Sequence, residues 1–373
     1  MTERMPVGTE GLRNKAMKAW ELGGFGRENL RMVEKDVRAP GNNEVLVKVS
    51  AVSLNARDKL LVEGAYNPDL AFPMVQGSDA VGVVVETGKN VTRVKHGDRV
   101  LTNFATRWLE GPPQSEESKY TLGNLISGAL AEQIVIDEEI AVHAPAYLTD
   151  IEAATLPCAA VTAWYAVAEK AKIYAGQYAG QNAGQHAGQN AGQYAGQTVL
   201  VQGTGGVSLF ALQIAAALGT EVIVTSSSDE KIERAKQMGA AHGINYVRQP
   251  DWEQAVLSLT AGKGADLIVE VAGGENLRRS LQAAKIGGHI ALIGFLDGVT
   301  SEIPLFPFVV KQLTVSGSSV GPRAAFEEML RSFEKWQLHP VIDTVYSFQD
   351  TLAAYDHLYR GAFGKIVISL NRD

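Results

Sequence analysis

The feature that most constrains this chain is a glycine-rich turn placed between a predicted strand and a predicted helix. Residues 198–202 are typical of a buried strand, and the turn at 203–206 (Gly-Thr-Gly-Gly) follows at once. Apolar residues then recur at helical spacing over 207–218, and residues 221–225 form a second strand-like run. This order is typical of a parallel sheet that binds a dinucleotide, because the helix N-terminus presents free N–H groups to a pyrophosphate.

The turn departs from the spacing G-x-G-x-x-G at one position, because Ser208 lies where the third glycine is expected. A glycine turn that binds no ligand is the alternative interpretation. The strand, helix and second strand around the turn favour the binding interpretation. We therefore predict that five consecutive residues contact a cofactor: Gly203, Thr204, Gly205, Gly206 and Val207.

The end of the second strand indicates which dinucleotide is bound. A carboxylate at this place would accept a hydrogen bond from the ribose 2′-hydroxyl of NAD, but the chain has Ser226 there and its first carboxylate at Asp229. Small hydroxyls followed by a lysine suit a 2′-phosphate, so Ser226, Ser227 and Lys231 predict NADPH. The alternative is that Ser227 and Glu230 form only a helix capping box, and the two roles are compatible.

The chain as a whole is predicted to be an α/β protein. Strand and helix patterns alternate over residues 147–320, which predicts a doubly wound parallel sheet of six strands. Residues 1–146 instead show short strands separated by turns, as in a small barrel or sandwich. Residues 321–373 hold an amphipathic helical pattern at 326–336 and a strand-like run at 365–368, which we expect to return to the first part.

A low-complexity insertion interrupts the second part. Residues 174–197 are six copies of x-Ala-Gly-Gln, with Tyr, Tyr, Asn, His, Asn and Tyr at x. A glycine at every fourth position costs a helix about 1 kcal/mol each relative to alanine, so we predict a loop or weakly ordered segment. Tandem duplication of a surface loop is the simplest interpretation, and a binding or assembly element is the alternative.

Composition limits the classes of partner that we expect the protein to bind and the cellular compartment in which we expect it. The single cysteine excludes a disulfide framework and a zinc site of four cysteines, and it favours a reducing compartment. Acidic residues outnumber basic ones by 41 to 34, a net charge of -7, which argues against nucleic acid. The N-terminus has no apolar run of signal-peptide length, and the uncharged stretch 174–220 is too polar for a bilayer. We expect a cytoplasmic protein with neither a membrane nor a nucleic-acid partner.

Across nearly its whole length the chain resembles the medium-chain dehydrogenase/reductase superfamily. Besides the glycine turn, the resemblance rests on segments 77–84, 97–100, 156–164, 239–246, 287–290 and 363–367. It implies a GroES-like catalytic domain at 1–146, a Rossmann NADP-binding domain at 147–320, and a C-terminal return to the catalytic domain at 321–373, with the active site in the cleft between them. Relatives are commonly dimers or tetramers, so the resemblance also implies a homodimer or homotetramer.

The same resemblance indicates whether a catalytic zinc ion is expected. Zinc-dependent members place a cysteine, a His-Glu pair and a later cysteine or aspartate around a catalytic metal. Here Asn55 holds the first place and Ser78-Asp79 the second, and only Cys158 matches. Asparagine and serine are poor zinc ligands, and a tight site needs at least three N, S or carboxylate ligands. The similarity is therefore to the zinc-independent quinone oxidoreductase and enone reductase branch, no metal is predicted, and Cys158 is interpreted as a packing residue rather than a ligand or nucleophile.

Catalysis without a metal favours particular substrates and residues. Hydride addition to an enone or quinone is easier than alcohol oxidation, because hydrogen-bond donors can stabilise the oxyanion that forms. Asn55 is the candidate donor, or positions the nicotinamide ribose, with a turn-stabilising role as its alternative. Asp58 is a candidate for proton relay that could equally cap a helix, and Thr162 is a candidate for seating the nicotinamide. Three aromatic residues are candidates to line an apolar pocket, with the core as the alternative: Tyr66, Phe104 and Trp108.

The resemblance also assigns cofactor contacts. Lys231 and Tyr246 match positions that contact the adenosine 2′-phosphate in quinone-reductase relatives, and Lys365 lies near a basic residue that relatives use against the cofactor. The nicotinamide half is matched by Ile293, Phe295, Leu296, Ser319 and Val320. The predicted function is NADPH-dependent, zinc-free reduction of a conjugated carbonyl or a quinone. The alternatives are a zinc-type alcohol dehydrogenase with atypical ligands and a non-catalytic, crystallin-like NADPH-binding protein.

Overall fold

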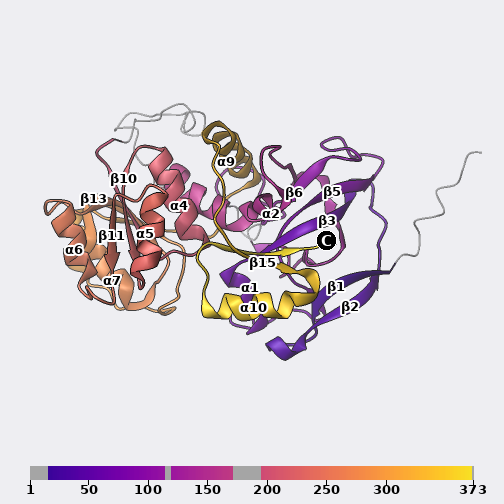
Figure 1. Ribbon diagram of the computed structural model, residues 1–373, viewed down its shortest axis with the longest axis horizontal. Helices are drawn as coiled ribbons and strands as arrows, with labels where there is room; N and C mark the ends of the chain where they lie inside the picture. The colour runs from indigo at the N-terminus through magenta and orange to yellow at the C-terminus, as the bar shows by residue number, and fades with distance from the viewer. Residues whose placement is uncertain (1–15, 114–118, 171–194, 372–373) are drawn as a thin grey trace, which may run out of the picture.

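The computed structural model describes residues 16–113, 119–170 and 195–371, and Figure 1 shows its two parts side by side. One part is β-rich, and the other is a sheet covered by helices. The x-Ala-Gly-Gln repeat lies outside the described residues except at 195–197. Among the described residues, no helix combines the length and the apolar character needed to cross a bilayer.

The helix-covered part contains a six-stranded sheet in which every pair of neighbouring strands is parallel. The strands lie in the order β11 (His242–Asn245), β10 (Glu221–Ser226), β9 (Thr198–Gln202), β12 (Ala265–Glu270), β13 (Ala284–Leu292) and β14 (Thr314–Gly317). The connecting helices are α4 (Gly206–Ala217), α5 (Asp229–Gln237), α6 (Trp252–Leu259), α7 (Gly274–Ala283) and α8 (Leu305–Lys311). The predicted six-stranded parallel sheet of the Rossmann type is confirmed.

The central strand β9 explains why the sheet is covered on both faces. All five of its residues are buried, as expected for an inner strand of a parallel sheet. Val199 and Val201 belong to a core that also includes α4 residues, whereas Leu200 belongs to a second core shared with residues of α6 and α7. The period of two along the strand therefore places helices on opposite faces.

The β-rich part is a GroES-like domain, as predicted, and it is built on a seven-stranded sheet. The strand order is β15 (Ile342–Ser347), β16 (Lys365–Ser369), β3 (Glu44–Leu54), β5 (Asp79–Thr87), β6 (Arg99–Thr102) and β8 (Ala141–His143), with β7 (Gln133–Asp137) paired to β3. A separate small sheet contains β2 (Leu30–Asp36), β1 (Ala16–Leu22) and β4 (Met74–Val75). Two α-helices also belong to the β-rich part, α1 (Ala56–Val62) and α10 (Thr351–Arg360).

Helical segments between the two parts carry residues of the site. They are α2 (Asp150–Ala153), α3 (Val161–Trp164) with a π-helical segment on either side (Leu156–Ala160 and Tyr165–Lys170), and α9 (Arg323–Trp336). The C-terminal strand β16 then pairs antiparallel with β3, with Ile366 opposite Leu54. This register brings Lys365 to the end of β3, where α1 begins.

Candidate active site

The glycine turn lies at the carboxyl end of β9 and leads directly into α4. Gly203 has a φ of +73°, which favours glycine, and its N–H donates to the Thr225 carbonyl at 2.9 Å. A Cβ on Gly206 would lie 2.7 Å from Cδ of Lys365, so this position also needs glycine. The N-cap of α4 is Gly205, and no side chain caps the helix. The N–H groups of its first turn are therefore available to an anion.

Ser208 explains why the third glycine of the usual spacing is missing. Its side chain is buried, and its Oγ donates to the Gln202 carbonyl at 2.7 Å. The hydroxyl thus ties the start of α4 to the end of β9, where a glycine would supply only close packing. The turn is built as predicted, and contact of its five residues with a cofactor stays a prediction.

A group of hydroxyl and cationic side chains lies near the end of β10, and we call it the β10 rim. Its members are Ser226, Ser227, Lys231, Tyr246 and Arg248. Ser226 is buried and its carbonyl accepts from the Tyr246 N–H at 3.1 Å, whereas Ser227 is exposed and the Tyr246 side chain is 43% exposed. The predicted residues Ser226, Ser227, Lys231 and Tyr246 are thus carried by adjacent strands and the start of α5.

Two details of the β10 rim differ from the sequence analysis. The helix cap is Ser228, whose Oγ accepts from the Lys231 N–H at 3.4 Å, so the capping box expected at Ser227 and Glu230 is wrong by one residue. Asp229 accepts from the Asn245 amide at 2.5 Å and pairs with Arg248 at 2.6 Å. Arg248 was not among the predicted residues. No sequence pattern marked it, because its approach depends on how β11 lies beside β10.

A cavity of about 550 Å³ opens between the two parts of the molecule. Four predicted residues line it, namely Ile293, Phe295, Ser319 and Val320. Leu296 is not among its lining residues and is 78% exposed. Trp108 lines the cavity from the β-rich part, as predicted for a pocket residue. The side chains therefore offer a largely apolar space at the nicotinamide end predicted from the sequence.

Two hydroxyls at this cavity bear on how it is held and what it binds. Thr162 is buried, and its Oγ1 donates to the Ser319 carbonyl at 2.6 Å, so it fixes the cavity wall. Ser318 also lines the cavity, and its buried Oγ has no hydrogen-bond partner. A buried hydroxyl without a partner is costly, so the Ser318 Oγ is available to a polar ligand atom or to a water molecule in the cavity. With the uncapped α4 and the glycine turn, these residues fit a dinucleotide.

Five side chains, from β16 and from the positions that the resemblance aligns with zinc ligands, form a second group, which we call the buried cluster: Asn55, Ser78, Asp79, Cys158 and Lys365. All of them are buried except Cys158, which is partly buried. The Lys365 ammonium donates to the Asn55 Oδ1 at 2.6 Å and to the Leu54 carbonyl at 2.8 Å. Ser78 donates to Asp79 Oδ1 at 2.7 Å, and the Cys158 N–H donates to Asp79 Oδ2 at 3.0 Å. The Asn55 Nδ2 lies 3.5 Å from the Ser78 Oγ.

Burial sets the protonation of the buried cluster. Burial raises the pKa of Asp79, which is fully buried, and the nearby Lys365 ammonium and hydrogen bonds from Ser78 and Asn55 oppose that rise. Burial, with the negative charge of Asp79, raises the pKa of the Cys158 thiol to about 12. Cys158 is therefore a protonated thiol near neutral pH, which agrees with its interpretation as a residue that is not a nucleophile.

The buried cluster does not fit a zinc ion. Both carboxylate oxygens of Asp79 and the Oδ1 of Asn55 already accept hydrogen bonds, and the Lys365 ammonium places a positive charge among these side chains. Among residues 16–113, 119–170 and 195–371, no group of three or more His, Cys, Asp or Glu side chains is arranged to hold a metal. The donor set contains no histidine, and Cys158 is its only cysteine, so it lacks the set of three N, S or carboxylate ligands that a tight zinc site needs.

Asp58 lies directly behind Asn55. Its Oδ2 accepts from the Asn55 N–H at 2.8 Å, and it lies 3.4 Å from an Arg57 guanidinium nitrogen. The structure thus supplies the helix-capping contact that was one of its two interpretations, and the relay role stays a prediction. Arg57 also packs over the Phe104 ring at 4.5 Å and the Tyr66 ring at 5.8 Å, neither of which lines the cavity.

One polar group escaped the sequence analysis. Glu270, at the end of β12, is completely buried and accepts from Gln202, Ser280, Asn276 and the backbone of Ala272 and Gly273. It joins the end of β9 to the turn that starts α7. That turn, at Gly273 and Gly274, lines the cavity. A carboxylate at the end of an apolar strand, followed three residues later by a Gly-Gly pair at 273–274, was the available signal.

Comparison with known proteins identifies the family. Two family models match: an alcohol dehydrogenase GroES-like domain over residues 41–146 and a zinc-binding dehydrogenase over residues 206–335. A zinc-type alcohol dehydrogenase-like protein of Schizosaccharomyces pombe is 37% identical over 359 residues, which cover 94% of this chain and 97% of the relative. Quinone oxidoreductase-like protein 2 of Rattus norvegicus is 27% identical, with coverage of 92% and 90%.

A solved structure from Sinorhizobium meliloti 1021, provisionally described as an alcohol dehydrogenase, superposes with a TM-score of 0.86 at 44% identity, covering 95% of this chain and 99% of that one. These whole-length matches agree with the GroES-like sheet, the six-stranded parallel sheet and the glycine turn. The chain therefore belongs to the medium-chain dehydrogenase/reductase superfamily, a family of NAD(P)-dependent oxidoreductases.

Proposed function

We propose that this oxidoreductase uses NADPH to reduce a conjugated carbonyl (an enone) or a quinone without zinc. The observation that carries the proposal is the buried cluster. The places of the family's metal ligands hold an amide, a hydroxyl, a fully hydrogen-bonded carboxylate and a protonated thiol, with a lysine ammonium among them. Such groups can stabilise an oxyanion by hydrogen bonding, but they cannot polarise an alcohol as a Lewis acid does.

Separate groups of residues would hold the two ends of NADPH. The glycine turn and the first turn of α4 would bind the pyrophosphate, and the β10 rim would bind the 2′-phosphate. The β10 strand ends in Ser226, and its nearest acid, Asp229, is already paired with Arg248. Ile293, Phe295, Ser319 and Val320 would surround the nicotinamide. NADPH would supply a hydride at this end.

Asn55 is the residue that we propose to act on the substrate, beside the nicotinamide end of the cofactor. Its Oδ1 is taken by Lys365, so its Nδ2 is the donor end of the amide, which has one long contact to Ser78 and a hydrogen bond to Asp79. When a hydride adds to the β-carbon of an enone, the electron pair of the double bond moves to the carbonyl oxygen. An N–H of Asn55 would donate to that oxygen, and water would then supply a proton to the α-carbon. Thr162 would keep the Ser319 segment against the ring.

The function is tested by measuring NADPH oxidation with an enone, a quinone and a simple ketone, and NADP⁺ reduction with a simple alcohol. We expect turnover of at least one conjugated acceptor, unchanged by a chelator, and little or no alcohol oxidation. Metal analysis of the same preparation provides the control. Strong alcohol oxidation with stoichiometric zinc would favour the zinc-type alternative. Tight NADPH binding without any turnover would favour the non-catalytic, crystallin-like alternative.

We also propose that copies of the chain associate through the edge of the six-stranded sheet. β14 is an outer strand, and the neighbouring α8 exposes Leu305, Phe306, Val309 and Val310 at 54–76%. An apolar face beside an open strand edge is typical of an oligomer interface. The double variant Phe306→Glu with Val309→Glu should lower the molecular mass measured by sedimentation. An unchanged mass would contradict this placement of the interface.

A further inference from the structure

Lys365 links the glycine turn to the start of α1 through its own side chain. The Gly364 N–H donates to the Thr204 carbonyl at 3.1 Å, which fixes the start of β16 on the turn. The aliphatic part of Lys365 passes beneath Gly206, where an added Cβ would lie 2.7 Å from its Cδ. Its ammonium then reaches the Leu54 carbonyl and the Asn55 Oδ1 in the other part of the molecule. Lys365 is 3% exposed, so these contacts are largely shielded from water.

The charge of Lys365 determines which way the Asn55 amide faces. The two ends of an asparagine side chain have nearly the same shape, but one only accepts and the other only donates. An ammonium group has only donors, so the Asn55 Oδ1 must face it. The Nδ2 is thereby turned to the opposite side, toward Ser78 and away from Lys365. A hydrogen bond to a charged donor is also stronger than one between neutral groups.

We propose that Lys365 is a positioning residue that holds the Asn55 amide with its Nδ2 toward the reacting oxygen. This inference rests on the proposed function, since it assigns how the oxyanion donor is oriented. Without the ammonium, Oδ1 loses its charged donor, and only the contacts of Nδ2 with Ser78 and Asp79 oppose a rotation that would present Oδ1, whose partial negative charge would repel a forming enolate. The alternative is that Lys365 acts on catalysis only by binding the cofactor, without Asn55.

A double-mutant cycle separates these two roles. Asn55→Ala removes the donor, and we expect its kcat at saturating NADPH to fall about 100-fold, as for loss of one oxyanion donor. Lys365→Met should lower kcat by about tenfold or more. If Lys365 acts through Asn55, adding Lys365→Met to Asn55→Ala should lower kcat by less than about threefold. Equal losses of kcat in both backgrounds would overturn the inference. NADPH dissociation constants, measured by fluorescence, keep cofactor binding separate.

Two further variants serve as matched controls. Asn55→Asp retains an acceptor for Lys365 but has no N–H, so it should lose kcat while its melting temperature stays near that of the wild type. Lys365→Arg retains a side chain with donors only, so it should restore part of the kcat that Lys365→Met loses. Full activity of Lys365→Met, or no recovery in Lys365→Arg when that variant folds and binds NADPH, would contradict the inference.

An NMR experiment tests the orientation without any substrate. In protein labelled with ¹⁵N-asparagine, the Asn55 side-chain NH₂ pair is assigned by its absence in Asn55→Asp. We expect this pair to shift or broaden in Lys365→Met and to stay near its wild-type position in Lys365→Arg. An unchanged pair in Lys365→Met would overturn the inference even if the enzyme reduces enones. Conversely, a wild-type protein that reduces no conjugated acceptor would refute the proposed function while leaving this readout intact.

Discussion

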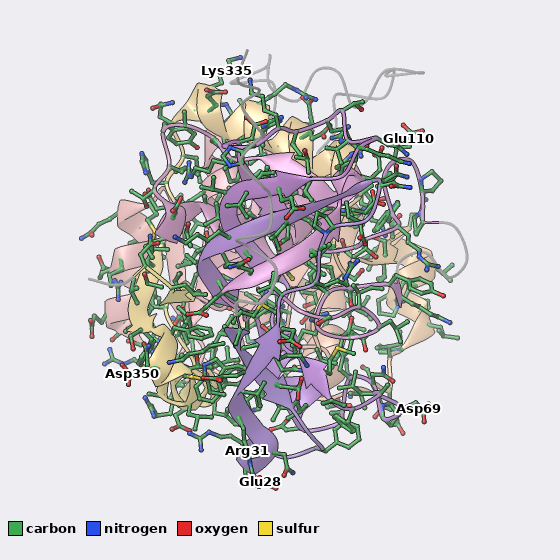
Figure 2. All side chains as sticks on the ribbon, turned by 90° about the vertical axis from the view of Figure 1, so that its right-hand side faces the viewer. Glu28, Arg31, Asp69, Glu110, Lys335 and Asp350 are labelled. Atoms are coloured by element: carbon green, nitrogen blue, oxygen red, sulfur yellow. The ribbon has the colours of Figure 1, made fainter. Side chains whose placement is uncertain are left out.

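The buried cluster and the β10 rim hold the residues that we propose to act at opposite ends of the cofactor, and they are built in opposite ways. In the buried cluster, Asp79 is fully buried and Lys365 is 3% exposed, and each of them has two hydrogen-bond partners within the protein. In the β10 rim, the Arg248 side chain is 75% exposed and that of Tyr246 is 43% exposed. Figure 2 shows that labelled charged residues elsewhere, such as Glu28, also lie at the periphery.

The difference indicates which residues determine the type of reaction and which determine the preference for NADPH over NADH. A buried ionic group must be paired and hydrogen-bonded, so one substitution changes the geometry of the whole cluster. An exposed charge is screened by water and salt, so each residue of the β10 rim contributes a small amount. We therefore expect the chemistry to depend strongly on a few residues and the choice between NADPH and NADH to depend weakly on several.

The largest effect is expected from breaking the buried cluster at Asp79. Asp79→Ala leaves the Lys365 ammonium without its nearby carboxylate, and it leaves the Ser78 hydroxyl and the Cys158 N–H without acceptors. Leaving two buried donors without acceptors, and a buried ammonium without a nearby negative charge, costs about 3–5 kcal/mol of the free energy of unfolding. Urea unfolding monitored by circular dichroism measures this loss.

The control is an ion pair at the surface. Arg38 and Glu44 contact each other at 2.7 Å, and the Arg38 side chain is 60% exposed. Glu44→Gln should cost less than about 1 kcal/mol. Similar losses for Asp79→Ala and Glu44→Gln would mean that burial does not distinguish the two regions.

The next effect concerns the reactivity of Cys158 and its dependence on pH. The thiolate is the reactive form, and the pKa of this thiol is raised from 9.0 to about 12. At pH 8 the thiolate fraction is then roughly a thousandfold below that of an ordinary thiol, since each pKa unit is a factor of ten. Alkylation by iodoacetamide should be slow in the native protein and fast in urea, and over the pH range in which the protein stays folded the native rate should keep rising with pH rather than level off near pH 9. Fast native alkylation at pH 8 would show that the thiol is not held in its neutral form.

How much of the fold and the site could be predicted from the sequence depends on whether a feature rests on local or on long-range contacts. The glycine turn and the strand before it are local patterns, so the parallel sheet and the position of the turn were predicted correctly. The contact of Lys365 with Asn55 joins residues 310 apart and depends on the register of β16 on β3, which no local pattern specifies. The cap of α5 was misplaced by one residue because three consecutive serines offer the same chemistry, and only the backbone selects Ser228.

A smaller effect is expected from removing the cations of the β10 rim. Lys231→Ala and Arg248→Ala should each weaken NADPH binding by about threefold to tenfold, because each removes one exposed charge near the proposed 2′-phosphate. Fluorescence titration with NADPH and NADH measures this, and NADH binding should change by less than twofold. The NADPH losses should also shrink in high salt. Equal losses for both cofactors would place these residues against another part of the dinucleotide.

The smallest effect is expected at Asp229, where the β10 rim holds its own acid. Asp229 pairs with Arg248 at 2.6 Å, but the two side chains are 47% and 75% exposed, so their attraction is worth less than about 1 kcal/mol. Asp229→Asn keeps an oxygen that can accept from Asn245, releases Arg248 and removes a negative charge near the proposed phosphate. NADPH should then bind about twofold to threefold more tightly, with NADH unchanged. Weaker NADPH binding would instead mean that Asp229 holds Arg248 in its binding position, and the β10 rim would resemble the buried cluster in depending on a defined pair.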